Sequence, residues 1–491
     1  MEKKEIIGIT VKKQDDFSEW FTQIVQKAEL ADIRFGIQGF IVHRPYGFRI
    51  IRKIYEYLEE EVEKDNHEPF LFPVVVKGDN LMKEKEHAGF TPDVFWVTEA
   101  GNEKLEERFA LRPTGEAQIY PLYSLWLRSY NDLPFKGYQS RITAYRNEKT
   151  TRPFIRGREF LFFETHDVFT SHEEVLKQVD KDLEISKKVI HDKLFIPFLF
   201  FKRPQWDKFK GADNTYSPDT IMNDGRKIQL ASTHDLGQNF SKAYNIKFLD
   251  KDKKEKYAWQ SCYGPGIWRT MAALISIHGD NNGLVLPFDI APVQIVIIPI
   301  YFSKDDRENK KVEIRCKEIQ RKLSKYRVKF DNSAESPGFK YNNYELFGVP
   351  LRIEIGPKEV KSNKVTLVKR TDLRRINVNV KNLLKEVEKN SILVDKKIKE
   401  NANIYFKNNT KDAKTFKALK EIINKHRGFV RVPFCSVNLD GEKCAMKIKD
   451  ETNGAVVCGT LYPISEKVKK NSKCIVCNNK ANFMVYVAKS Y

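Results

Sequence analysis

The chain of 491 residues is 41% hydrophobic and 12% aromatic, a composition that excludes a disordered protein and is sufficient for roughly two to four folded domains. It carries 86 Lys and Arg against 66 Asp and Glu, and its net charge of +20 favours a polyanionic partner. The excess is concentrated in residues 361–430, where 19 basic and 7 acidic residues favour nucleic acid over an ordinary solvated surface.

Features of membrane or secreted proteins are missing from this sequence. No apolar run is long enough to cross a membrane, and the start, MEKKEIIGIT, lacks the apolar core of a secretory signal. Seven cysteines in a chain of this length do not make a disulfide scaffold. We therefore expect a cytoplasmic protein in a reducing compartment, without membrane association.

The N-terminal part is predicted to contain two amphipathic helices, because apolar residues recur at helical spacing in residues 15–30 and 49–64. The run LFPVVV, residues 71–76, then predicts a strand that contains Pro73. Residues 77–107 are polar and include charged turns with glycine, which indicates a mobile loop beside a site.

The turn RPTGE follows a short predicted strand and places Thr114 and Glu116 before a helix that runs through Tyr120 to Leu127. Short polar residues in such a turn can reach a ligand. They equally suit a helix N-terminus, with Thr114 as the cap and Glu116 near the positive end of the helix dipole. The residue types alone leave both interpretations open.

Residues 146–166 are predicted to form two strands joined by a cationic turn. REFLFFETH alternates so that Phe160, Phe162, Glu164 and His166 share one face. An aromatic pair, a carboxylate and a histidine beneath a fixed arginine suit a small cationic ligand beside an anion, because guanidinium binds phosphate oxygens bidentately. The alternative is an ordinary basic hairpin.

Two later segments place polar residues beside strand ends. RKIQLASTHDLGQNF holds a cluster of Gln, Ser, Thr and His that includes His234, although a histidine without further context is more often structural. Gly264 and Gly266 bring a strand to a close turn, and Arg269 opens an apolar helix. An arginine there either aims at an anion across the sheet or lies on the surface of a buried helix.

From Pro292 onward strands alternate with helices, which indicates a compact α/β domain. Strands are predicted at VQIVIIPI, VKF, PLRIEIG and KVTLVKR, and helices at 313–326 and 380–389. A last segment, from about Ser391, begins with a Lys-rich helix and contains a CxxC motif at Cys474–Cys477. Two thiolates from one tight turn suit tetrahedral Zn²⁺, and the alternative is a set of unpaired core cysteines.

These segments, in this order, resemble a prolyl-tRNA synthetase of the archaeal and eukaryotic type, a class II aminoacyl-tRNA synthetase, over nearly the whole chain. Pro73 matches the proline of motif 1, YRNE and RGREFLFFETH resemble motif 2, and GPGIWR, which ends in Arg269, resembles motif 3. RPTGE resembles the proline-pocket turn, and DFSEWFTQ, STHDLGQNFSK, HGDNNGLVLP and GVPLRIEIGPKE resemble further family signatures. The collinear order of these motifs argues against an accidental similarity.

The resemblance implies an α+β class II synthetase catalytic domain with a six-stranded antiparallel sheet and helices. An α/β anticodon-binding domain and a small C-terminal zinc-binding α+β domain follow. We expect these domains at residues 1–290, 291–390 and 391–491. The resemblance also implies a homodimer formed through motif 1, and it implies that Tyr491 packs toward the active site.

The resemblance further implies a role for individual residues. Those expected at ATP, with Arg146 and Arg269 as the catalytic phosphate clamps, are Arg146, Glu148, Arg156, Gly157, Gln229, Ser232 and Arg269. Those expected around proline are Thr114, Glu116, Phe160, Phe162, Glu164 and His234. Those expected to read anticodon bases are Glu345, Arg352, Lys358 and Glu359, and the expected zinc ligands are Cys435, Cys444, Cys474 and Cys477. Cys262, Cys316 and Cys458 are then buried thiols.

The implied reaction attaches L-proline to tRNA(Pro) in two steps. The proline carboxylate attacks the α-phosphate of ATP, releasing pyrophosphate, and the terminal ribose of the tRNA then takes the prolyl group from prolyl-adenylate and releases AMP. Such transfers depend on positioning and charge neutralisation, with Mg²⁺ bridging phosphate oxygens. Glu148 would accept from the adenine amino group, and Glu116 or Glu164 would bind the secondary ammonium.

Two alternatives stay open at this point. The first is a class II synthetase for another amino acid such as threonine, although the aromatic residues and carboxylates offer no obvious metal site for a hydroxyl substrate. The second is a non-catalytic, synthetase-like protein that binds tRNA. It would be expected to lose the arginines of motifs 2 and 3, and Arg146 and Arg269 are both present.

Overall fold

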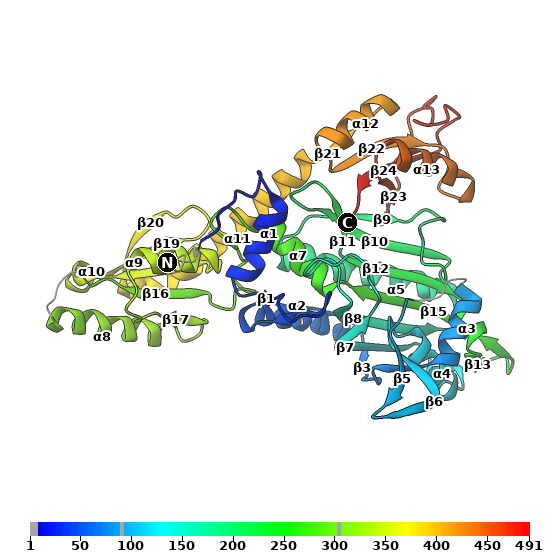
Figure 1. The fold of residues 1–491 in the computed structure, drawn as a ribbon, viewed down its shortest axis with the longest axis horizontal. Coiled ribbons are helices and arrows are strands. Elements are labelled where there is room, and N and C mark those ends of the chain that lie inside the picture. The colour runs from blue at the N-terminus through cyan, green and yellow to red at the C-terminus, as the bar shows by residue number, and fades with distance from the viewer. Residues whose placement is uncertain (1–7, 89–92, 302–305) are drawn as a thin grey trace.

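The computed structural model describes residues 8–88, 93–301 and 306–491, and three parts follow one another along the chain (Figure 1). A large catalytic part lies at the centre and lower right, an arm extends to the left, and the C-terminal part lies at the top. No helix within the described residues is long and apolar enough to cross a membrane.

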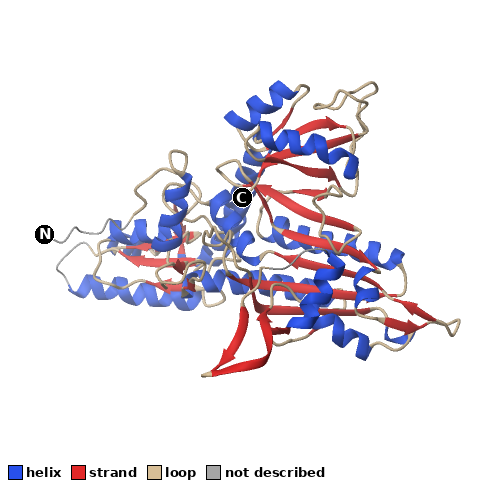
Figure 2. Cartoon of the chain, turned by 45° about the vertical axis from the view of Figure 1, so that its right-hand side comes forward, coloured by secondary structure: helices blue, strands red, loops and turns tan. Residues whose placement is uncertain are grey.

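One sheet of twelve strands extends through the catalytic and C-terminal parts (Figure 2). Its middle consists of six antiparallel strands, which confirms the sheet that the family resemblance implied. In spatial order they are β9 (Leu199–Lys202), β10 (Asn214–Ile221), β12 (Ala231–Gly237), β15 (Trp259–Pro265), β8 (Glu159–Phe169) and β7 (Phe135–Tyr145). β3 (Glu68–Pro69) pairs with β7 in parallel at the edge, and β11 (Lys227–Gln229) pairs with β10.

Helices cover this sheet, most of them by burying one apolar side, whereas all residues of α7 except Arg269 are buried. α1 (Phe17–Lys27), α2 (Pro45–Lys64) and α7 (Ile267–His278) contribute to one hydrophobic cluster, and α5 (His172–Ser186), continued by a π-helical turn at Lys187–Lys193, packs on β12 and β15. α2 begins earlier than the predicted residue 49. The reason is Pro45, whose missing N–H and fixed φ suit the first turn of a helix.

Residues 77–107 do not form the predicted mobile loop. They form α3 (Gly78–Ala88), β5 (Trp96–Ala100) and most of β6 (Glu103–Leu111), while residues 89–92 lie outside the described residues. The strand predicted at 71–76 is reduced to β4 (Val75–Lys77), which pairs with β6. Most residues of β5 and β6 are exposed or only partly buried, so their sequence lacks the apolar alternation that predicts a strand.

Short elements complete the catalytic part. They are β1 (Ala31–Asp32), β2 (Val42–His43), α4 (Glu116–Trp126), α6 (Asn239–Ala243), β13 (Lys247–Leu249), β14 (Glu255–Tyr257) and a 3₁₀ turn at Tyr130–Asp132. α4 confirms the helix predicted through Tyr120 to Leu127; it starts at Glu116 and ends at Trp126.

The arm is an α/β domain, as predicted. Its five strands lie in the order β17 (Val328–Phe330), β16 (Ile295–Pro299), β18 (Leu351–Ile355), β19 (Lys364–Lys369) and β20 (Arg375–Asn379). Its helices are α8 (Asp306–Lys322), α9 (Pro337–Leu346) and α10 (Pro357–Ser362). The sequence predicted four of these strands and missed β20, whose residues RINVN are mostly exposed or half-buried.

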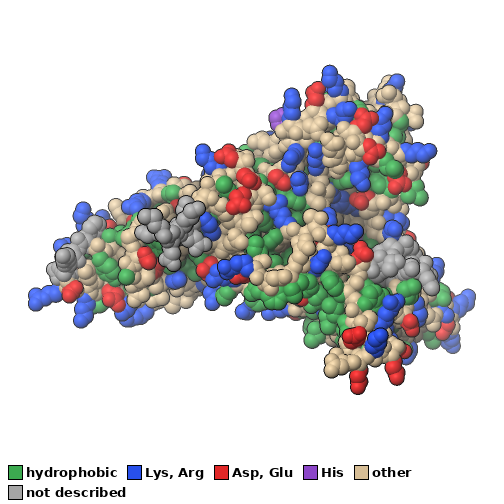
Figure 3. All heavy atoms as spheres, in the orientation of Figure 1, with side chains coloured by type: hydrophobic (Ala, Val, Ile, Leu, Met, Phe, Trp, Pro, Cys, Tyr) green, Lys and Arg blue, Asp and Glu red, His purple; other side chains and the backbone are tan. Residues whose placement is uncertain are grey.

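A single helix, α11 (Leu383–Asn408), connects the arm to the C-terminal part, where two separate helices were predicted. The C-terminal part contains β21 (Thr410–Asp412), α12 (Phe416–Lys425), β22 (Phe429–Phe434), α13 (Glu442–Glu451), β23 (Ala455–Leu461) and β24 (Phe483–Lys489), with 3₁₀ turns at Val380–Asn382 and Leu439–Gly441. β23 pairs with β9, so the two parts share one sheet. Lys and Arg side chains are spread over the arm and this part (Figure 3).

Candidate active site

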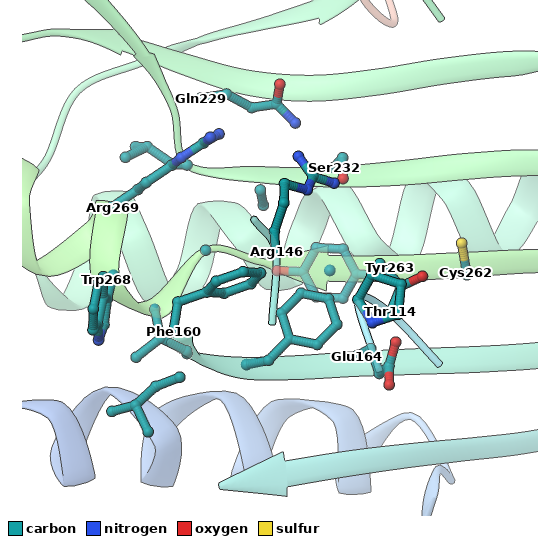
Figure 4. Close-up of a pocket in the computed structure, with 18 of the residues that line it drawn as sticks. Thr114, Arg146, Phe160, Glu164, Gln229, Ser232, Cys262, Tyr263, Trp268 and Arg269 are labelled. Atoms are coloured by element: carbon teal, nitrogen blue, oxygen red, sulfur yellow. The ribbon is translucent and has the colours of Figure 1, made fainter. Parts of the chain in front are cut away.

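One cavity of about 300 Å³ lies on the antiparallel sheet. It brings together the residues predicted at ATP and those predicted around proline. All seven residues predicted at ATP and all six predicted around proline line it. They come from β8, β11, β12, the turn before α4 and the first residue of that helix, the segments between β7 and β8, and the start of α7. Figure 4 shows Thr114 and Glu164 at one end, Arg269 and Gln229 at the other, and Arg146 between them.

The end beside Glu164 is a buried carboxylate site. Glu164 accepts hydrogen bonds from the backbone N–H of Gly115 at 3.0 Å and from Gln139 Nε2 at 3.1 Å, and His166 Nε2 lies 2.9 Å from it. The Tyr120 hydroxyl lies 2.9 Å from the other ring nitrogen of His166. These contacts fix Glu164 in one position, and the sequence did not assign His166 to the ligand although it placed this side chain on the correct face.

Glu116 lies at the same end and is only 5% exposed. Among the described residues its Oε2 has no hydrogen-bond partner. Burial raises the pKa of Glu116, since the charged form loses its water and Glu164 adds repulsion. For His166, burial opposes the charged ring, but the charge and hydrogen bond of Glu164 outweigh it and raise its pKa. A cationic ligand at Glu116 would supply the partner that its carboxylate lacks.

The turn before α4 does not cap this helix through a side chain. The N-cap of α4 is Gly115, and no side chain caps this helix, so the interpretation of Thr114 as a cap is wrong. A Cβ on Gly115 would lie 2.3 Å from Glu164 Oε1. Only glycine therefore allows the backbone to approach Glu164 so closely.

The opposite end of the cavity is cationic. Arg146, Arg156 and Arg269 all line it, and burial together with repulsion from Arg156 and Arg146 lowers the pKa of Arg269 to about 10. With this pKa Arg269 remains charged at neutral pH. Arg156 donates to Glu148 at 3.4 Å and to the backbone oxygen of Tyr491 at 2.9 Å. Such a group of arginines suits a ligand with several negative charges.

Gln229 and Ser232 lie beside the arginines, and Gln229 is held by a buried network that the sequence did not predict. Arg203 donates to both oxygens of Asp219 at 2.8 Å and to Gln229 Oε1 at 3.2 Å, and Lys227 donates to Asp219 at 2.8 Å. The amide oxygen of Gln229 is thereby occupied, so its NH₂ group is the part that remains for a ligand. In the sequence, only the polar residues on the strands that turn out to be neighbours could have indicated this network.

His234 is half-buried, and its Nδ1 lies 2.8 Å from the Thr215 hydroxyl. Burial and the nearby cations His166 and Arg203 lower its pKa to about 3, so the ring is neutral.

The rings of Phe160 and Phe162 meet edge to face with centroids 5.8 Å apart. A Cβ on Gly157 would lie 2.5 Å from the Trp268 ring, which explains glycine at that position.

The four residues predicted to read anticodon bases lie in the arm, in two places. Arg352 donates to Glu345 at 2.9 Å and to Glu354 at 3.0 Å, and its guanidinium lies 4.1 Å from the centre of the Tyr341 ring. Lys358 and Glu359 lie on α10 beyond the other end of β18. Lys358 is exposed, whereas Glu359 accepts from the backbone N–H of Gly356 at 3.0 Å and so supports the start of α10.

The four cysteines predicted to bind zinc form one cluster. One sulfur from each of Cys435, Cys444, Cys474 and Cys477 lies within 4.8 Å of every other, and Cys435 and Cys444 are 3.7 Å apart. Cys262, Cys316 and Cys458 lie elsewhere as buried thiols, as predicted. Burial raises the pKa of Cys458 to about 11 and that of Cys316 to about 12, so neither is reactive at neutral pH.

The sheet and this two-ended pocket define a class II aminoacyl-tRNA synthetase. Residues 95–278 match the family model described as tRNA synthetase class II core domain (G, H, P, S and T). Residues 294–390 match the anticodon binding domain, and residues 416–491 match the model described as prolyl-tRNA synthetase, C-terminal.

Relatives that match over the full length identify the family within this class of synthetases. The chain is 50% identical over 489 residues to the proline–tRNA ligase of Thermofilum pendens, covering 99% of both chains, and 39% identical over 484 residues to that of Pyrococcus horikoshii, covering 97% and 98%. The Giardia lamblia prolyl-tRNA synthetase in complex with prolyl-adenylate superposes with a TM-score of 0.94 at 33% identity, covering 98% and 100%. The Cryptosporidium parvum enzyme complexed with L-proline and AMP gives 0.91 at 30%, covering 100% and 99%. The chain belongs to the prolyl-tRNA synthetase family.

Proposed function

We propose that this pocket activates proline with ATP and that the protein attaches L-proline to tRNA(Pro) through prolyl-adenylate, releasing pyrophosphate and AMP. One observation carries this proposal: a single cavity joins a buried carboxylate end, where Glu116 Oε2 is unpartnered among the described residues, to a cluster of three arginines. The first end matches a secondary ammonium and the second a triphosphate. Solved relatives that hold prolyl-adenylate, or L-proline with AMP, support the same assignment.

Different residues bind different parts of the two substrates in the first step. Glu116 and Glu164 hold the ammonium of proline, and Phe160 and Phe162 form an apolar wall for its ring. Arg146 and Arg269 neutralise charge on the phosphates as the carboxylate attacks. Glu148 accepts from adenine, and Gln229 and Ser232 orient the nucleotide. No side chain needs to form a covalent bond.

Mg²⁺ fits this chemistry as a partner of ATP. It takes oxygen ligands and in phosphate sites is usually held by phosphate oxygens with one or two carboxylates. At the arginine end Glu148 is the lining carboxylate, and it already faces Arg156 at 3.4 Å. Mg²⁺ would therefore be held chiefly by the phosphates of ATP and would neutralise part of their charge.

ATP–pyrophosphate exchange with each standard amino acid tests the assignment. We expect exchange to be strongest with proline. Strongest exchange with threonine would favour the other synthetase, and no exchange with any amino acid would favour a tRNA-binding protein without catalysis.

Alanine should also be activated, weakly, and alanyl-tRNA should not be cleared by this protein. A pocket shaped for proline rejects a smaller side chain by only about 1–3 kcal/mol for each missing methylene. The segment from His166 to Tyr257, between the motif 2 and motif 3 segments, is described throughout. It forms α5, α6 and β9–β14 of the catalytic part, which leaves no residues for a separate hydrolytic domain. Incubation of purified protein with alanyl-tRNA checks this expectation, and rapid hydrolysis would contradict it.

Glu345, Arg352, Lys358 and Glu359 are proposed to read the anticodon. Splayed bases of an unstacked loop are read by side chains such as these. Lys358→Ala should raise the KM for tRNA(Pro) roughly tenfold, the size of one charged contact, while leaving adenylate formation intact. Arg352→Ala is the less clean test, since it removes the ion pair of Glu345 and leaves Glu354 only its longer contact with Arg375 at 3.4 Å. Equal losses for Lys358→Ala in charging and in pyrophosphate exchange would instead indicate a structural role.

The cysteine cluster is proposed to bind one structural Zn²⁺. A tetrahedron with metal–sulfur bonds of about 2.3 Å has edges of about 3.8 Å, which the 3.7 Å separation of Cys435 and Cys444 fits. Four thiolates leave no open position, so the metal would stabilise the C-terminal domain rather than take part in the reaction.

The remaining proposals concern the homodimer, the cellular location and the domain boundaries. A homodimer through motif 1 is supported by exposed apolar residues next to Pro73, where Leu71 is 83% and Val74 is 39% exposed, and light scattering of the purified protein tests it. A cytoplasmic location is proposed from the reduced cysteines. The proposed domains remain 1–290, 291–390 and 391–491, and the second boundary falls inside α11.

A further inference from the structure

A second cavity, of about 440 Å³, adjoins the active site at its arginine end. Four residues of the arginine end line both cavities, namely Arg156, Gln229, Ser232 and Arg269, and the two cavities also share Ile155, Phe209 and His234. The second one continues between the catalytic strands and the C-terminal domain, where Val456, Ser490 and Tyr491 line it. None of the roles assigned above to ATP, proline or tRNA uses this continuation.

The lining of this cavity is strongly cationic. Five cations, Arg156, Arg203, Lys208, Lys227 and Arg269, line it against one carboxylate, Asp207. Asp219, behind the wall, neutralises only part of this charge, because Arg203 and Lys227 share it. Of the other three cations, Arg156 pairs with Glu148 at 3.4 Å, whereas Lys208 and Arg269 form no ion pair within the described residues. Such a lining suits a small anion with several charges.

Two of the cations, Arg203 and Lys227, are held by ion pairs in the wall of the cavity, and a third, Lys208, is not. Arg203 and Lys227 are 4% and 5% exposed, and their bonds to Asp219 hold them in place. Lys208 is half-buried, and its Nζ donates to the backbone oxygen of Asp213 at 3.3 Å. Within the described part of the chain Lys208 forms no ion pair, so its charge is available to a ligand.

The geometry of the first reaction step directs a product toward this cavity. A carboxylate oxygen of proline bonds to the α-phosphorus while the bond from that phosphorus to its bridging oxygen breaks, and the electron pair leaves with pyrophosphate. Attacking and leaving oxygens are roughly in line in such displacements. Proline enters from the end of Thr114 and Glu164, so the leaving group departs toward Arg269 and Gln229 (Figure 4).

We propose that the second cavity is the site through which pyrophosphate leaves, and that Lys208 binds it there together with Arg156 and Arg269. The inference rests on the proposed ATP and proline ends of the active site. It assigns a role in product binding to Lys208, a residue outside every motif of the sequence. The anion it binds is pyrophosphate, alone or with Mg²⁺.

The reverse reaction measures pyrophosphate binding directly. Full-length protein is loaded with proline and ATP, the complex with prolyl-adenylate is isolated, and its return to ATP is followed in single turnovers at increasing Mg²⁺–pyrophosphate. Lys208→Ala should raise the half-saturating pyrophosphate concentration roughly tenfold to a hundredfold, the range for one charged hydrogen bond. Lys208→Glu should raise it further, and Lys208→Arg should restore most of the affinity, since the positive charge remains.

Lys242→Ala is the matched control, because Lys242 is exposed on the nearby α6 and does not line the cavity. An unchanged half-saturating concentration in Lys208→Ala and Lys208→Glu would overturn the inference. A loss confined to prolyl transfer to tRNA would also overturn it, because the cavity would then serve the end of the tRNA. If the unsubstituted protein forms no prolyl-adenylate, the proposed function fails instead.

Discussion

Replacing Arg146 by alanine should lower proline-dependent ATP–pyrophosphate exchange by about a thousandfold, the upper range for losing one preorganised donor to a developing charge. Arg146 lies between the carboxylate end and the arginine end of the pocket, where the α-phosphate must meet the carboxylate of proline (Figure 4). Arg146→Lys should recover only part of the activity, since an ammonium cannot bind two phosphate oxygens in a fixed plane.

The fold should survive this substitution. Over the described ranges of the chain no ion pair involves the Arg146 side chain, and its backbone N–H bonds to the carbonyl of Arg158 at 2.9 Å, which alanine retains. Arg128→Ala is a suitable control, because Arg128 is exposed at the end of α4, away from the cavity. Near-normal exchange by a well-folded Arg146→Ala protein would refute the role of this arginine, whereas loss of the fold would be detected by circular dichroism.

The catalytic pocket was predictable because its residues lie within short motifs that alternate or turn sharply. Phe160, Phe162 and Glu164 share a face for the simple reason that β8 has a period of two. Arg269 opens α7 directly after the glycine turn that the sequence contains. In each case the local backbone geometry is sufficient to predict that the side chain points into the pocket.

Other parts of the site depend on contacts between distant segments, which no local pattern records. Arg203 and Gln229 are 26 residues apart and meet only because β9, β10 and β11 lie side by side. The pairing of β23 with β9, which merges two domains into one sheet, joins residues more than 250 positions apart. The strands β5 and β20 were missed since their residues are largely exposed and their polarity resembles that of loops.

The C-terminal domain should depend on its metal. Cys474→Ser should abolish zinc binding, because the remaining three thiolates cannot complete the tetrahedron, and purified unsubstituted protein should contain about one zinc per chain. Binding energy of structural zinc is folding energy, on the order of 10 kcal/mol in small zinc peptides. The cluster joins the end of β22 and helix α13 to the loop between β23 and β24, so its loss should loosen residues 416–491. Hydrogen exchange and limited proteolysis measure that loosening.

Cys458→Ser supplies the matched control for the zinc prediction. Cys458 is buried in β23, and its sulfur lies 3.8 Å from the carbonyl of Val456, outside the four-cysteine cluster, so this variant should retain zinc. Loosening of the domain in Cys474→Ser should also release Tyr491, whose hydroxyl bonds to Asp224 at 2.7 Å and whose backbone oxygen accepts from Arg156 at 2.9 Å. Arg156 lines the ATP end of the pocket, so zinc loss should raise the KM for ATP several-fold, the scale of one charged contact. A metal-free protein whose C-terminal domain resists proteolysis as well as the zinc-loaded form would rule out a structural zinc.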